Sequence, residues 1–132
     1  MIRFDKLTLK SQEALQAAQQ HAQEKNNPQV APEHLLWALT DQKDGVVLPI
    51  LQKLGVNLQS FARDLATGVA KLPKVQGQAE LYLSPGLNSV LENAFKEADH
   101  FKDEYVSAEH LLIALATSKG EEAGRLLQSH GV

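Results

Sequence analysis

An internal repeat limits the folds that this chain can adopt. Residues 30–56 and 106–132 align without a gap at an offset of 76 positions, and 12 of the 27 aligned positions are identical. Both segments share an EHLL-x-AL block, a later Leu-Gln pair and a Gly-Val ending. The same offset aligns Thr8 with Ser84 and Leu15 with Leu91 upstream. We therefore predict a fold built from two copies of one unit of at least 49 residues, 8–56 and 84–132.

Each copy has the pattern of three helices. Thr8 and Ser84 are good N-caps for a first helix, in which apolar residues then recur at three- and four-residue steps. The second helix begins at the EHLL block, whose glutamate lies in the first turn, where the helix dipole favours a carboxylate. The third helix is followed by Gly55 or Gly131, which we expect to form left-handed C-caps.

The first copy continues into a fourth helix that the second copy lacks. Asn57 is its expected N-cap, and Pro73 ends it. We expect a single all-α domain over 1–132, with repeat one at 8–72, a connector without helical period at 73–83, and repeat two at 84–132. The copies are expected to be related by a pseudo-twofold axis and to form seven or eight helices. We expect a fragment of a longer protein whose final helix is truncated; the alternative is a second copy that never had this helix.

Charge and composition exclude several classes of function. The net charge is −3 and no Lys/Arg cluster occurs, whereas a nucleic-acid binder needs a basic face. No apolar stretch approaches the roughly 20 residues that span a bilayer, and the N-terminus lacks the apolar run of a signal peptide. We therefore expect a cytoplasmic protein that binds neither nucleic acid nor membrane.

Sequence motifs for catalysis are absent. The chain contains no G-x-x-x-x-G-K-[ST] phosphate loop, no G-x-G-x-x-G, no G-x-S-x-G and no H-E-x-x-H. His34 and His110 occupy equivalent positions beside Glu33 and Glu109, but nothing in their spacing completes a metal site. We expect each histidine to pack at the start of the second helix and to bond a loop carbonyl. The prediction is a domain without catalytic residues, metal or cofactor.

What remains is a surface for protein binding. Two copies packed about a pseudo-twofold axis are expected to leave a groove between their first helices, lined by Leu9, Leu87 and Leu91. An apolar groove with a polar rim is a common way for helical domains to hold peptides. The alternative is that these leucines belong to the core.

Several motifs together resemble a known family. They are RFDKLTLKSQEALQAAQQHA, PEHLLWAL, LQKLGV, LPKVQG with YLSP, EYVSAEHLLIAL and LLQSHGV. Over essentially the whole chain they are similar to the N-terminal domain of Clp-family AAA+ unfoldases. The connector LPKVQG with YLSP resembles the ClpB disaggregases more than the ClpA or ClpC type.

The resemblance implies a substrate-binding domain ahead of two ATPase modules. Those modules bind ATP and Mg²⁺, form a homohexamer and disaggregate proteins in the stress response with the DnaK system. The domain itself, a monomer when isolated, engages unfolded or aggregated protein. Thr8, Asp103 and Glu109 match a polar cluster that supports substrate handling in the family. The structural alternative is that Thr8 is an N-cap and Glu109 a first-turn acid.

Two other functions stay open at this stage. One is adaptor docking by a protease-linked Clp unfoldase of the ClpA or ClpC type. The other, from a different class, is a free-standing hydrolase or metal enzyme, which a tightly bound stoichiometric metal would support.

Overall fold

The computed structural model describes residues 4–76, 81–118 and 120–132, and most of these residues are helical. The elements, in chain order, are η1 (Phe4–Lys6), α1 (Leu9–Glu24), β1 (Gln29–Val30), α2 (Pro32–Asp41), α3 (Val47–Lys53), α4 (Leu58–Ala70), β2 (Tyr82–Leu83), α5 (Pro85–His100), α6 (Ala108–Ala116) and α7 (Glu122–Ser129). The described ranges thus contain seven α-helices and two strands of two residues each. The predicted all-α class is confirmed.

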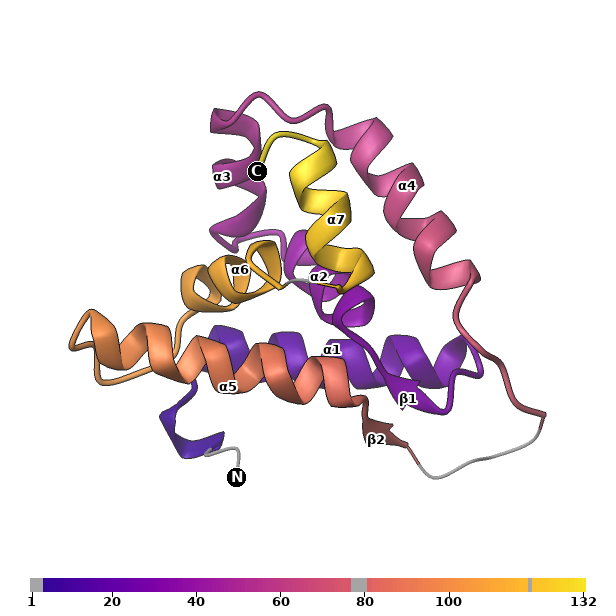
Figure 1. Cartoon of the computed structure of the whole chain (residues 1–132), viewed down its shortest axis with the longest axis horizontal. Coiled ribbons are helices and arrows are strands. Elements are labelled where there is room, and N and C mark those ends of the chain that lie inside the picture. The colour runs from indigo at the N-terminus through magenta and orange to yellow at the C-terminus, as the bar shows by residue number, and fades with distance from the viewer. Residues whose placement is uncertain (1–3, 77–80, 119) are drawn as a thin grey trace.

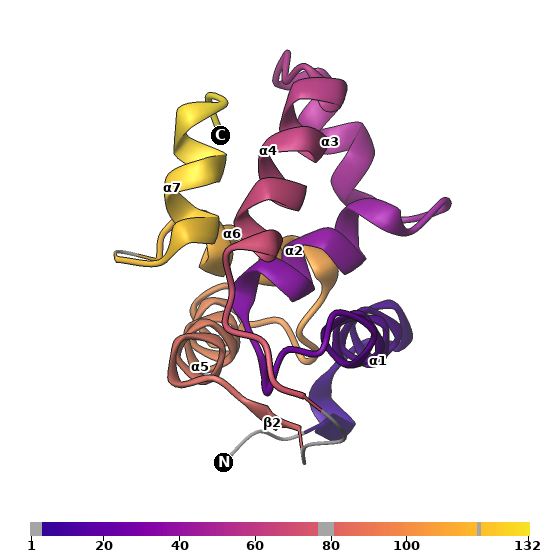
Figure 2. The same cartoon turned by 90° about the vertical axis from the view of Figure 1, so that its right-hand side faces the viewer.

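The helices follow the sequence repeat. The bounds of α1 and α5 differ by 76 positions at both ends, and α6 and α7 match α2 and α3 within one residue at their starts. Figure 2 shows α1 and α5 nearly end-on at the base, with α2 and α6 above them. Helices α3, α4 and α7 form the upper part of the molecule in Figure 1. The position equivalent to the start of α4 would lie beyond Val132, the last residue of the sequence.

Capping residues act as the sequence predicts. The side-chain oxygens of Thr8 and Ser84 each accept a hydrogen bond from the backbone N–H three residues later, at 3.2 and 3.0 Å. Gly55 and Gly131 have φ angles of 83° and 87°, in the left-handed region that favours glycine. The two copies therefore share not only their helices but also the turns that start and end them.

Short parallel strand contacts join the two copies. In β1 and β2, Val30 of the first copy pairs with Leu83, just before α5 of the second. An isolated bridge pairs Leu7, just before α1, with Val106 of the second copy. The two pairings are equivalent under the offset of 76, which is the reciprocal pattern that a twofold relation requires. The connector, predicted only to lack a helical period, ends in the short strand β2.

Buried apolar side chains of both copies form one cluster. In α1 the buried face is the predicted stripe of Ala14, Leu15, Ala18 and Ala22. The buried face of α5 comprises Leu87, Val90, Leu91, Ala94 and Ala98. Each first helix packs this face against the second helix of its own copy, so the repeated EHLL blocks lie at the centre of the domain.

His34 binds the backbone N–H of the N-cap residue at the start of α2, the contact that the third helical residue makes in a capping box. Ala31 occupies the N-cap position, and its N–H donates to Nδ1 of His34 at 2.9 Å. Because Nδ1 accepts, Nε2 of the neutral ring carries the proton and donates to Oδ1 of Asn27 at 2.8 Å. The amide of Asn27 in turn donates to the carbonyl of Pro73 at 2.8 Å.

His110 repeats this arrangement in the second copy with a charged partner. Its Nδ1 accepts from the N–H of Ser107 at 2.9 Å, and its Nε2 lies 2.8 Å from Oδ2 of Asp103. Both histidines thus have the expected packing position at the start of the second helix. The expected bond to a loop carbonyl is wrong, because each ring bridges a backbone N–H and a side-chain oxygen.

The burial of His34 predicts a pH-dependent stability. Burial, aided by nearby His21, lowers the pKa of His34 from 6.5 to about 4. The unfolded chain therefore binds a proton that the folded chain does not, between about pH 6.5 and pH 4. The contribution of neutral His34 to the free energy of unfolding is complete above this window. The free energy of unfolding decreases by roughly 2–3 kcal/mol as the pH falls through the window. Urea unfolding of wild type and His34→Gln at about pH 7 and about pH 4.5 measures this effect.

The variant is expected to be less stable than wild type near neutral pH but to lose less stability on acidification. His21, whose pKa burial also lowers, is present in both proteins, so its contribution largely cancels in the comparison. Equal losses of stability in the two proteins would contradict the assignment.

Candidate functional site

A cleft of about 230 Å³ lies where the two copies meet. The first copy contributes the start of α1 and the loop between α2 and α3, and the second contributes the start of α6. Its lining residues are Thr8, Lys10, Gln42, Asp44, Gly45, Val46, Ser107, Ala108 and Glu109. We call this the junction cleft. It brings together Thr8 and Glu109, two of the six predicted site residues.

Hydrogen bonds to one carbonyl set the separation of the cleft walls. The N–H of Thr8 and the buried hydroxyl of Ser11 both donate to the carbonyl of Val106, at 3.0 and 2.9 Å. The Thr8 hydroxyl donates to Oγ of Ser11 at 3.0 Å. Because Val106 lies two residues before α6, this network fixes the start of α1 against the start of α6.

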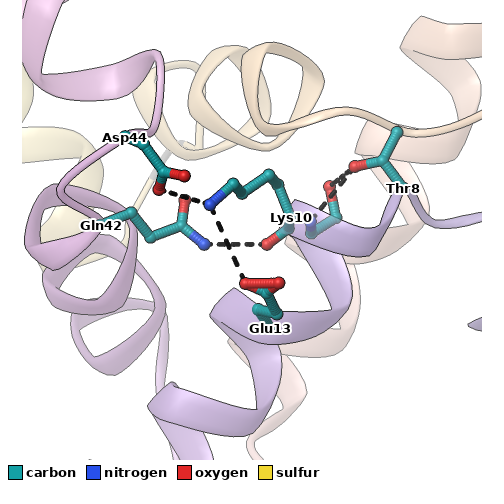
Figure 3. A network of polar contacts seen from close by, with 6 residues as sticks. Thr8, Lys10, Glu13, Gln42 and Asp44 are labelled. Carbon is teal, nitrogen blue, oxygen red and sulfur yellow. Dashed lines mark hydrogen bonds and ion pairs between the residues drawn. The ribbon is translucent and has the colours of Figure 1, made fainter.

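A polar network around Lys10 anchors the α2–α3 loop, as Figure 3 shows. The Lys10 ammonium contacts the carboxylate of Asp44 and lies 4.0 Å from that of Glu13. The amide of Gln42 donates to the carbonyl of Lys10 at 2.9 Å. The hydrogen bond between Lys10 and Asp44 raises the pKa of the lysine and lowers the pKa of the aspartate, so both stay charged at neutral pH.

Gln42 leaves an unused acceptor in the wall of the cleft. Its Oε1 is buried and has no hydrogen-bond partner among the described residues. Gly45 makes room for this side chain, since an added Cβ would lie 2.9 Å from Cβ of Gln42. Buried acceptors are normally paired, but this oxygen faces Gly45 and has no surface open to a donor in the cleft.

The two first-turn glutamates of the repeat have different surroundings. Glu109 is exposed at the rim of the junction cleft, whereas its equivalent Glu33 is only 5% exposed. Burial raises the pKa of Glu33. In the other copy, Gly86 takes the position of Lys10 and lies against the carboxylate of Glu121. A Cβ added to Gly86 would clash with that carboxylate. Of the two glutamates, only Glu109 is thus accessible to a partner.

Asp103 acts on the cleft from outside. Its carboxylate bonds His110, whose ring holds the N–H of Ser107, a cleft residue. Asp103 itself does not line the cleft. Its position supports a structural role at the start of α6, next to Glu109, rather than direct contact with a ligand in this cleft.

The three predicted leucines do not form a groove. Leu87 and Leu91 are fully buried in the core, so the expectation that they line an open surface is wrong, and the core alternative holds for them. The reason is that the apolar stripe of α5 packs against α6. Leu9 is 76% exposed and adjoins Thr8 in the chain, but it is not a lining residue of the cleft.

Sequence reasoning missed most of the residues that surround the cleft. The interacting trio of Lys10, Gln42 and Asp44 aligns with Gly86, Ser118 and Gly120 in the other copy. The repeat preserves the core and cap residues but not these polar side chains. Their difference between the copies is the sequence signal that could have indicated the cleft.

Two further properties concern the described residues as a whole. No group of three His, Asp or Glu side chains within them is arranged to hold a metal ion. None of the helices in the described ranges is long and apolar enough to cross a bilayer.

Comparison with known families settles the relationship. Residues 6–130 match the Clp repeat (R) N-terminal domain. The chain belongs to this family. Such Clp N-terminal domains are small helical units, in agreement with the fold observed here.

Curated relatives are chaperones of one kind. The chain is 39% identical over 127 residues to the chaperone protein ClpB of Bdellovibrio bacteriovorus, which covers 96% of the chain. It is 44% identical over 128 residues to ClpB of Corynebacterium diphtheriae, which covers 94% of the chain. In both comparisons the chain spans only 15% of the relative's length.

Solved structures share the fold. The N-terminal domain of Hsp104 from Candida albicans has a TM-score of 0.83 and 23% identity, covering 96% of this chain and 82% of that one. A complex of the ClpV N-domain with a VipB peptide has a TM-score of 0.77 and 23% identity, covering 96% of this chain and 77% of the other.

The geometry separates the capping role of Thr8 from the role of Glu109. Thr8→Val keeps the side-chain volume but removes the oxygen that caps α1, so we expect a loss of about 1 kcal/mol in unfolding free energy. Glu109→Gln changes an exposed side chain and is expected to stay within about 0.5 kcal/mol of wild type. Chemical denaturation measures both values. A loss for Glu109→Gln as large as that for Thr8→Val would instead make Glu109 a stability residue.

Proposed function

We propose that this chain is the substrate-binding domain of a ClpB-type disaggregase and that the junction cleft holds a segment of unfolded or aggregated polypeptide. The observation that carries the proposal is that Thr8 and Glu109 line one cleft between the copies. Both residues are of the type that the family resemblance implies for substrate handling.

The chemistry of the cleft suits a polypeptide chain. The carboxylates of Glu109 and Asp44 are acceptors, which fit backbone N–H groups and basic side chains. Val46, 42% exposed, adds an apolar contact. Because a cleft of this size buries little area, we expect dissociation constants in the high-micromolar range or weaker.

The remaining activities are assigned to the rest of the parent protein. The chain covers 15% of the length of its ClpB relatives and contains no phosphate loop. We infer that ATP and Mg²⁺ bind in other modules, which form the hexamer and work with the DnaK system in the cytoplasm. The domain captures substrate, binds no cofactor and is a monomer when isolated.

Adaptor docking is the second candidate. The solved complex of the ClpV N-domain with a VipB peptide supports it, because a domain of this fold there holds one defined peptide. A docking domain is expected to bind one sequence tightly, whereas a substrate domain binds many unfolded sequences weakly.

An NMR titration with a permanently unfolded protein, reduced and carboxymethylated lactalbumin, tests the proposal. We expect the largest shifts at Thr8, Lys10, Gln42 and Glu109, with Glu109→Gln weakening binding roughly 3- to 10-fold at unchanged stability. Glu92→Gln, an exposed change on α5, is the matched control and should bind as wild type.

The proposal fails if shifts lie on another face or if Glu109→Gln binds as tightly as Glu92→Gln. Binding of a single adaptor-derived peptide with no response to the unfolded protein would favour the docking alternative.

A further inference from the structure

A second cavity lies at the opposite end of α1 from the junction cleft. It measures about 200 Å³ and lies between the C-terminal parts of α1 and α4 and the middle of α2. Its lining includes His21, Lys25, Trp37, Val69 and Lys74. From Thr8 to Lys25 is 17 residues, almost all helical, or about 25 Å at 1.5 Å per residue. A ligand here would therefore not reach the junction cleft.

The cavity continues into a neighbour along α4. The neighbouring cavity measures about 290 Å³ and includes Leu48, Phe61 and Asp41 in its lining. Trp37 and Ala66 line both cavities, so the two form one groove, which we call the α2–α4 groove. Along α4 it extends from Leu58 to Ala70, about 18 Å.

The aromatic wall of the groove is rigid but has an unsatisfied polar atom. The rings of His21 and Trp37 stack at 3.8 Å with an interplanar angle of 26°. His21 is 8% exposed, and its Nδ1 is buried without a hydrogen-bond partner in the described parts of the chain. Buried nitrogens are normally paired, so this atom is an exception within the wall, but it has no surface open to a ligand.

The two ends of the groove carry opposite charges. Lys25 and Lys74 lie at one end, and neither forms an ion pair within 4 Å among the described residues. The turn after α1 holds the segment after α4, because the N–H of Val75 donates to the carbonyl of Asn26 at 2.8 Å. Figure 1 shows the C-terminal ends of α1 and α4 approaching each other on the right. Asp41 lies at the other end.

We propose that the α2–α4 groove binds a partner protein segment that places an apolar side chain in each cavity and a carboxylate at Lys25 and Lys74. The groove length of about 18 Å corresponds to about five or six residues of extended chain. In a protein of net charge −3, two unpaired lysines beside an apolar cavity favour an acidic partner over a basic one. This partner differs from the donor-rich segment expected at the junction cleft.

Trp37 provides a direct probe, because it is the single tryptophan of the sequence. Three synthetic peptides, acetylated and amidated, carry Asp followed by Leu and Phe separated by one, two or three serines. We expect at least one of them to produce a saturable change in tryptophan emission. No change with any of the three would overturn the proposal.

Substitutions on α4 show where the peptide binds. Ala66→Arg fills the groove from an exposed helix position, and we expect it to weaken binding at least about tenfold. Thr67→Arg adds the same side chain at the adjacent exposed position, which lines neither cavity, and should bind as wild type. Equal affinities for the two variants would rule out the groove.

Substitutions of lysine test the charge requirement. The double variant Lys25→Gln/Lys74→Gln should weaken binding about 3- to 10-fold, and replacing Asp by Asn in the peptide should have the same effect. Lys53→Gln/Lys96→Gln, at two exposed positions outside the groove, is the control. An unchanged affinity in Lys25→Gln/Lys74→Gln would contradict the proposal that the partner is acidic.

The same titration with Glu109→Gln distinguishes this site from the junction cleft. Glu109→Gln should bind the peptide with the same affinity as wild type, whether or not it binds unfolded lactalbumin more weakly. A loss of affinity in Glu109→Gln would place the peptide in the junction cleft and overturn the inference.

Discussion

The pairing of short extended segments between the two copies determines where this domain has a binding surface. Leu7 pairs with Val106, and Val30 pairs with Leu83, so the segment before the first helix of each copy is held by the other copy. The first of these pairings brings Thr8 to the start of α6 and thereby creates the junction cleft. Without it, Thr8 would only cap α1 and Glu109 would only be a first-turn residue of α6, separated from Thr8 by about 100 residues of chain.

Helices and caps could be predicted because they depend on local physics. The period of apolar residues and the preference for Thr8, Ser84, Gly55 and Gly131 at helix ends are properties of short segments. Periodicity shows which residues share a face but not what covers that face. The period of α5 therefore does not show that α6 covers Leu87, and no local pattern predicts strand pairing between segments far apart in sequence.

The histidines show that a repeat can preserve a structural contact. The equivalent rings lie beside glutamates, but each ring bonds the backbone N–H at the start of its helix. The bond is the same in both copies, whether the N-cap residue is Ala31 or Ser107. The partner changes from Asn27 to Asp103 between copies, while both distances stay at 2.8 Å. The repeat therefore preserves the hydrogen-bond geometry of the histidine, whereas the charge of its partner side chain differs between the copies.

Function in a duplicated fold follows from the positions where the copies differ. A perfect twofold would give two equal clefts, yet Glu33 is buried where Glu109 is exposed. Lys10 and Asp44, which anchor the loop at the junction cleft, align with two glycines. Likewise the α2–α4 groove depends on Trp37, which aligns with Ile113. The shared core thus supports two surfaces of different chemistry at opposite ends of α1, so a change at one can leave the other intact.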